Sequence, residues 1–180
     1  QASMMECKKA LDESSGNFEK ALIILQKRGK QLADKRAARA TKQGIIEEYI
    51  HSNKKIGVLV ELNCETDFVA KNVMFKELAH ELAMHIAAMS PQYIAAEDVP
   101  EEILWQKKAS YNEEFKNSGK NETVINQIVD GKIKKFYEEV CLLEQPFVKD
   151  PDQKVKDIVS DYIGKIGENI KIGRFARLEI

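Results

Sequence analysis

The stretch IGVLVELNCETDFVA, residues 56–70, decides the fold of this chain. In residues 56–64 an apolar side chain or a cysteine occupies every second position, which is the period of a β-strand with one buried face. Residues 45–51 are also rich in strand-forming side chains, and the polar residues 52–55 between the two runs are typical of a hairpin connection. We therefore expect a hairpin whose second strand runs directly into residues 66–69 and then into a long helix.

The rest of the chain alternates helical and strand patterns around that hairpin. Apolar residues recur at helical spacing over residues 75–89, and further helices are expected over residues 100–117, 122–130, 132–143 and 152–166, with a break at Gly131. The tail alternates again, and we expect one side of a third strand to carry Ile170, Ile172, Ala176, Leu178 and Ile180. The sequence predicts an α+β fold, with a core of a three-stranded, mostly antiparallel sheet packed with helices.

The N-terminal residues have the pattern of a small helical module. Met4, Cys7 and Leu11 fall on one helix face, Asn17 can cap a second helix, and Gly29 suits the end of that helix. Two short helices cannot close a core alone, so we expect a first helix of this module to be missing from the sequence.

Three parts of the chain follow from these patterns. We predict the helical module over residues 1–29, a basic connecting helix or linker over residues 30–43, and an α+β dimerisation and core domain over residues 44–180. The basic residues of the linker could contact RNA, but no pair of aromatic side chains accompanies them for base stacking. A solvated linker is the simpler interpretation.

Composition limits the classes of partner. The chain has 180 residues, 43% of them hydrophobic, and its 28 basic and 29 acidic residues leave a net charge of −1. Such a balance gives no long-range attraction to nucleic acid or to anionic lipid. Cys7, Cys64 and Cys141 lack the spacing of a disulfide framework, and no run approaches the roughly 18 apolar residues of a membrane span. We expect a cytoplasmic protein that binds another protein, and neither a nucleic acid nor a membrane.

Three common motifs of enzyme chemistry are absent from the sequence. The sequence contains no GxxxxGK[ST] loop, no GxGxxG after a strand and no GxSxG. His80 and His85 are five residues apart, so on a helix they point about 140° away from each other, which does not suit a shared metal ion. We expect no catalytic residue, no metal and no cofactor, and hence a binding protein rather than an enzyme.

Three segments resemble the elongation factor Ts family. MMECKKAL, residues 4–11, is similar to the family's Met-Met-Asp-Cys-Lys-Lys-Ala-Leu, residues 56–70 are similar to its second signature, and KIGENI, residues 165–170, matches near the end. The matches are collinear and together span essentially the whole chain. The chain departs from the family at Gln1-Ala2-Ser3, where glycines are usual. It has a single hairpin and a single Thr-Asp-Phe-Val segment, so it resembles the short form.

The resemblance implies a function and a set of partner-binding residues. It implies a guanine-nucleotide exchange factor that binds elongation factor Tu with GDP, disturbs the magnesium and phosphate site and promotes GDP release in translation elongation. It also implies an N-terminal module like ubiquitin-associated domains, and a homodimer for a short member of the family. The residues that it assigns to the elongation factor Tu interface are Met4, Met5, Lys8, Thr66, Asp67, Phe68 and Val69.

Some of these residues also have a purely structural interpretation. Thr66 or Asp67 could be a helix N-cap, and Phe68 could be a hydrophobic staple on the following helix. Met4 lies on the stripe of Cys7, so it suits a core as well as an interface, whereas Met5 lies about 100° further round the helix. A different class of function also fits the sequence, namely a protein-interaction adaptor without exchange activity.

Overall fold

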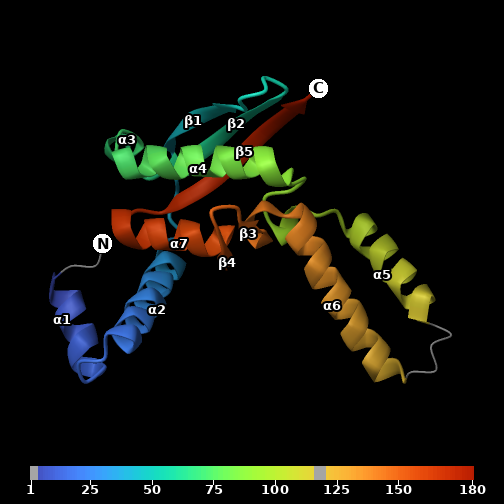
Figure 1. Ribbon diagram of the computed structural model, residues 1–180, viewed down its shortest axis with the longest axis horizontal. Helices are drawn as coiled ribbons and strands as arrows, with labels where there is room; N and C mark the ends of the chain where they lie inside the picture. Colours follow the sequence, from blue (N-terminus) through green and yellow to red (C-terminus); the bar gives the residue numbers. More distant parts are fainter. Residues whose placement is uncertain (1–3, 116–120) are drawn as a thin grey trace. The chain divides into compact units, whose positions relative to one another are not determined.

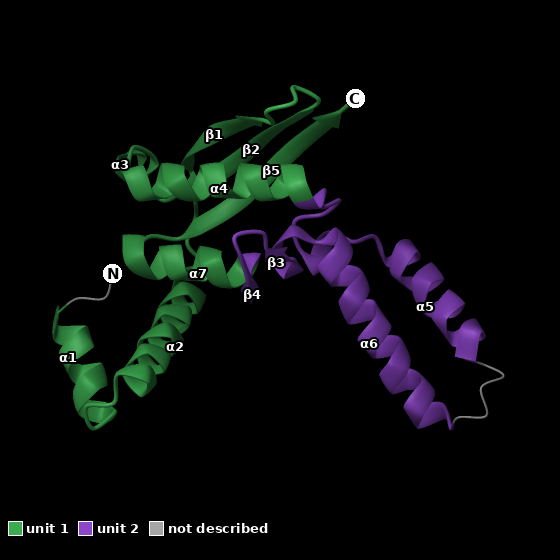
Figure 2. Ribbon diagram, in the orientation of Figure 1, with its two compact units in different colours: residues 1–88, 156–180 green, residues 89–155 purple. Residues whose placement is uncertain are grey.

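The computed structural model describes residues 4–115 and 121–180, which form two compact units (Figure 2). Residues 1–88 and 156–180 make up the first unit, and residues 89–155 make up the second. The three residues Gln1-Ala2-Ser3 and the expected helix end at residue 117 lie outside the described residues. Among the described residues, no helix combines the length and the apolar character needed to cross a membrane.

The first unit contains a three-stranded antiparallel sheet (Figure 1). Strand β1 (Gln43–Ile50) pairs with β2 (Ile56–Cys64), and β2 pairs with β5 (Ile170–Glu179), so the hairpin and the third strand are confirmed. Helix α4 (Val73–Met89) is joined to both outer strands, through His80 to Glu47 and through Arg177 to the carbonyl of Ala87. The alternating residues of β2 are buried as predicted: Val58, Val60, Leu62 and Cys64.

The predicted face of the third strand is wrong beyond its first residues. The register of β2 and β5 shifts between the pairs Val60–Phe175 and Leu62–Ile172, so β5 contains a bulge. A bulge adds one residue and reverses which side chains face the core. Phe175 is therefore half-buried, whereas Ala176, Leu178 and Ile180, which were expected on the side of Ile170, are exposed.

Two helices precede the sheet, and the second is longer than predicted. Helix α1 (Met4–Glu13) packs with α2 (Phe18–Arg36), whose N-cap is Asn17 as expected. The expected helix end at Gly29 is wrong, because α2 continues through it. Helix α7 (Val155–Ile166) approaches there, and a Cβ atom on its Gly164 would lie 3.5 Å from the Cα atom of Gly29. Gly29 thus lies inside α2 where α7 approaches it closely, and it does not end the helix.

The second unit contains a pair of helices and a short hairpin. Helix α5 spans Glu101–Phe115 and α6 spans Glu122–Val140, while β3 (Pro146–Phe147) pairs with β4 (Asp150–Lys154). Two short 3₁₀ helices, η1 (Ala96–Asp98) and η2 (Leu142–Glu144), complete it. The predicted break at Gly131 is wrong because α6 runs through it. The helix predicted from residue 152 begins only at Val155, because residues 150–154 form β4.

Candidate functional site: the corner after strand β2

The sequence between β2 and α4 folds as a tight corner around a four-residue helix, α3 (Asp67–Ala70). Thr66 is its N-cap, with an extended backbone, and its hydroxyl oxygen accepts a hydrogen bond from the Val69 amide at 3.4 Å. Val69 and Ala70 are buried, and these two side chains anchor the corner to the first unit. The N-cap interpretation therefore applies to Thr66.

Phe68 points away from the core. It is 79% exposed, although it lies directly beside the buried Val69. A hydrophobic staple would pack against the helix that follows, so this exposure rules out that interpretation of Phe68. A large aromatic side chain left in water on an anchored corner is a feature that binding to another surface would explain.

Asp67 adds a negative charge next to the aromatic ring. Its carboxylate accepts a hydrogen bond from the Lys71 ammonium group at 2.9 Å, one helical turn away, and both side chains are largely exposed. The hydrogen bond and the positive charge of Lys71 lower the pKa of Asp67 below its usual value. The corner therefore presents an ionised carboxylate at neutral pH.

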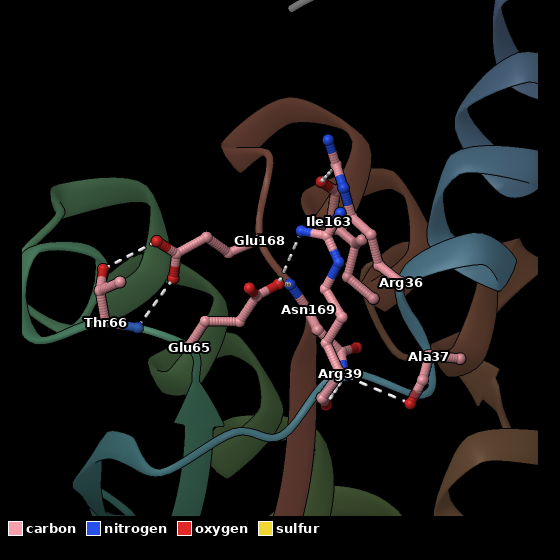
Figure 3. A network of polar contacts seen from close by, with 8 residues as sticks. All are labelled: Arg36, Ala37, Arg39, Glu65, Thr66, Ile163, Glu168 and Asn169. Atoms are coloured by element: carbon pink, nitrogen blue, oxygen red, sulfur yellow. Dashed lines mark hydrogen bonds and ion pairs between the residues drawn. The ribbon is translucent and has the colours of Figure 1, made fainter.

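A set of polar contacts holds the base of the corner (Figure 3). The Glu168 carboxylate accepts hydrogen bonds from the Thr66 amide at 3.0 Å and from the Thr66 hydroxyl at 2.7 Å. The Glu65 carboxylate accepts a hydrogen bond from the backbone amide of Asn169 at 2.7 Å. Sequence reasoning did not assign these glutamates or Asn169 to the site. The available signal was Gly167, a typical helix end, followed by two polar residues just before a strand.

The other predicted site residues lie on a separate element. Met4, Met5 and Lys8 belong to α1, and all three are exposed, Met4 to 89% and Met5 to 64%. Met4 is thus outside the core that the described residues form, and its alternative interpretation as a core residue is wrong for this structure. The structure gathers Thr66, Asp67, Phe68 and Val69 in the corner, whereas the three other residues lie on helix α1.

The described part of the chain offers no group of three or more His, Cys, Asp or Glu side chains placed to hold a metal ion. His80 contacts Glu47 at 3.1 Å, and His85 is completely buried on α4. The geometry of the corner suits contact with another macromolecule through one aromatic ring and one carboxylate.

Comparisons with known proteins agree on one family. The family model described as "Elongation factor TS" matches residues 2–162. Elongation factor Ts of Thermosipho melanesiensis is 54% identical over 179 residues, which are 99% of this chain and 91% of that protein. Elongation factor Ts of Pseudothermotoga lettingae is 54% identical and that of Thermodesulfovibrio yellowstonii 51%, each over 99% of this chain, and 90% and 89% of their own lengths are covered.

Proposed function

The chain belongs to the elongation factor Ts family, whose members are translation elongation factors, and we propose that it is the guanine-nucleotide exchange factor of elongation factor Tu. The observation that carries the proposal is the exposed Phe68 on a corner that buried Val69 and Ala70 anchor. The corner lies within residues 56–70, which resemble the second family signature. The proposal assigns the chain a binding role without catalytic residues, in the cytoplasm, where translation takes place.

The proposed mechanism uses the corner as a wedge. A P-loop GTPase holds its nucleotide through phosphate contacts and a Mg²⁺ ion. Mg²⁺ requires near-ideal octahedral geometry, so a small displacement of its ligands costs much of its affinity. Phe68 inserts between packed elements of elongation factor Tu and shifts them to another discrete packing, since cores do not deform smoothly. The charge of Asp67 acts beside the Phe68 ring, and Thr66 and Val69 hold Asp67 and Phe68 in position.

The helical module supplies a second contact with the same partner. Met4 and Met5 present flexible, polarizable side chains that adapt to an irregular apolar surface. Their high exposure and the neighbouring exposed Lys8 support this assignment. Contacts far from the nucleotide provide binding energy, and the corner uses that energy to disturb the magnesium site.

We also propose that the chain forms a homodimer through its sheet. The face of the sheet that carries Ile46 and Leu59 leaves both side chains more than half exposed, and Leu178 on β5 is 76% exposed. Leu178 pairs with Gly57, two residues before Leu59, so the three side chains share one face. A second copy that places the same face against this one would remove all of them from water.

The exchange proposal is tested by GDP release. Elongation factor Tu loaded with fluorescent GDP is mixed with excess unlabelled GDP and a catalytic amount of the chain, and the fluorescence decay is followed. We expect one molecule of the chain to release many molecules of GDP. An adaptor without exchange activity would bind elongation factor Tu and leave the spontaneous release rate unchanged, and that result would reject the proposal.

A further inference from the structure

Two dipeptides that are about a hundred positions apart exchange hydrogen bonds beneath the Phe68 corner. Glu65-Thr66 follows β2 and Glu168-Asn169 precedes β5, and each glutamate accepts a hydrogen bond from the backbone amide of the second residue in the other dipeptide (Figure 3). The Glu168 carboxylate also accepts a hydrogen bond from the Thr66 hydroxyl at 2.7 Å. We call these four residues the corner clamp.

The local chain geometry places Glu168 at this point. Helix α7 ends at Ile166, and the Gly167 amide donates to the carbonyl of Ile163 at 3.0 Å. Gly167 has a φ of +90°, a conformation that a residue with a Cβ atom rarely adopts. The turn at Gly167 therefore directs Glu168 towards Thr66, while Ile170 pairs with Cys64 at the start of the β2–β5 ladder.

Helix α3 is too short to fix the direction of Phe68 by itself. It has four residues, and helix formation becomes favourable only over much longer segments. Its N-cap hydrogen bond, from the Val69 amide to the Thr66 hydroxyl oxygen, is long at 3.4 Å. Other contacts must therefore hold the corner, and they include the burial of Val69 and Ala70, the two hydrogen bonds from Thr66 to Glu168, and the Cys64 thiol, which donates to the Thr66 carbonyl at 3.1 Å.

We propose that Glu168 is a positioning residue for nucleotide exchange, because its carboxylate holds Thr66 and thereby fixes the direction in which Phe68 is presented to elongation factor Tu. This inference rests on the proposed function and adds a residue that does not touch the partner. A carboxylate with two donors from one residue is suited to the task, since charge-assisted hydrogen bonds are shorter and stronger than neutral ones.

Asn169 extends the clamp to the segment that follows α2. Asn169 is 1% exposed, and its side-chain amide nitrogen donates to the backbone carbonyls of Ala37 at 3.3 Å and Arg39 at 2.8 Å. The Arg39 guanidinium group lies 3.5 Å from the Glu65 carboxylate. The corner and the segment leading from the helical module are thus attached to the same four residues.

The role differs from a general contribution to stability. Both hydrogen bonds from Thr66 to Glu168 lie at an exposed position, where water can replace the lost partner. Loss of the Glu168 carboxylate should therefore free the corner locally and leave the sheet intact. Exchange activity should fall by more than the stability of the chain does.

The test is a double-mutant cycle on GDP release from elongation factor Tu, with Glu168→Ala, Phe68→Ala and the double variant. We expect Glu168→Ala to slow catalysed release about tenfold, because it removes two charge-assisted hydrogen bonds at an exposed position, where water replaces much of what they contribute. In the Phe68→Ala background the same change should have no further effect, because no ring remains to be positioned. Glu168→Gln, which keeps one acceptor for Thr66, should restore part of the rate.

A matched control and a structural measurement accompany the cycle. Glu179 lies at the other end of β5 and forms an exposed ion pair with Arg177, so Glu179→Ala should release GDP at the wild-type rate. Amide hydrogen exchange of the chain alone should become faster at Val69 in Glu168→Ala and stay unchanged at Val60, in the middle of β2. If Glu168→Ala does not fold, Thr66→Val takes its place in the cycle; it replaces the hydroxyl with a methyl group and so removes the bond to Glu168 together with the N-cap bond from Val69.

Three results would overturn the inference. Wild-type release by Glu168→Ala together with slow release by Phe68→Ala would reject the positioning role and leave the proposed function standing. Additive losses in the double variant would show that Glu168 acts independently of Phe68. A wild-type chain that fails to accelerate release would reject the proposed function and the positioning role together, and this outcome differs from the other two because no variant would then differ from wild type.

Discussion

Replacing Phe68 with alanine should leave the chain folded and slow GDP release from elongation factor Tu by about 30-fold. Full burial of a phenylalanine side chain stabilises by roughly 1.5–3 kcal/mol. Phe68 is 79% exposed in the chain alone, so most of its surface can be buried only when a partner binds. Burying that surface against the partner should contribute about 2 kcal/mol. A loss of that size in the transition state corresponds to about a 30-fold slower step.

The assay measures catalysed release of fluorescent GDP over a range of concentrations of the variant. In urea unfolding, the free energy of unfolding of Phe68→Ala should be only about 0.5 kcal/mol lower than that of the wild type, because only about a fifth of the Phe68 surface is buried in the chain alone. Trp105 on α5 is 72% exposed, so Trp105→Ala is a matched control that removes a similarly exposed aromatic ring and should keep the wild-type rate. The reasoning is refuted if Phe68→Ala releases GDP at the wild-type rate, or if Trp105→Ala is slowed as much.

Three further predictions address the sheet, the helices and the dimer. Gly44→Ala should lower the free energy of unfolding by about 1–3 kcal/mol, because its Cβ atom would overlap the Leu62 carbonyl oxygen; an unchanged urea midpoint contradicts this. Burial raises the pKa of Asp161 above its usual value, despite the nearby Lys165 and Lys30. At this site the native state then binds more protons than the unfolded state between the usual and the raised pKa, so the contribution of Asp161 to stability should fall as pH rises through that window. Asp161→Asn should flatten this fall in urea unfolding measured across the acidic range, and a variant that keeps the wild-type slope argues against it. Leu59→Lys should convert the dimer to a monomer in sedimentation equilibrium, whereas a wild-type chain that sediments as a monomer removes the dimer proposal.

Local patterns were sufficient to predict the elements that bury one regular face. The alternation in β2 and the helical stripe of α4 each repeat over several positions, and both are buried as expected except at their ends, where Ile56 is half-buried and Met89 is exposed. Asn17 was predicted as an N-cap from its neighbours alone, and its side chain accepts a hydrogen bond from the Lys20 amide. Such features depend on residues that are close in sequence.

The features that sequence reasoning missed depend on distant contacts. Gly29 has the properties of a helix end, but α2 continues through it, and Gly164 of α7, which lies more than a hundred positions away, packs close to it. The bulge in β5 follows from its register with β2 rather than from its own pattern. The corner clamp joins Thr66 to Glu168 across the chain, so no local rule reveals it. Phe68 itself was identified through the family resemblance, since its spacing alone favoured a staple.

The most direct test of the account asks where position 68 lies when the partner is bound. The chain is prepared with the photoreactive residue benzoyl-phenylalanine in place of Phe68, mixed with nucleotide-free elongation factor Tu and irradiated, and the cross-linked peptides are identified by mass spectrometry. We predict cross-links to the nucleotide-binding domain of elongation factor Tu, next to its magnesium and phosphate site. Cross-links confined to this chain, or to a region of the partner remote from the nucleotide, would contradict the account.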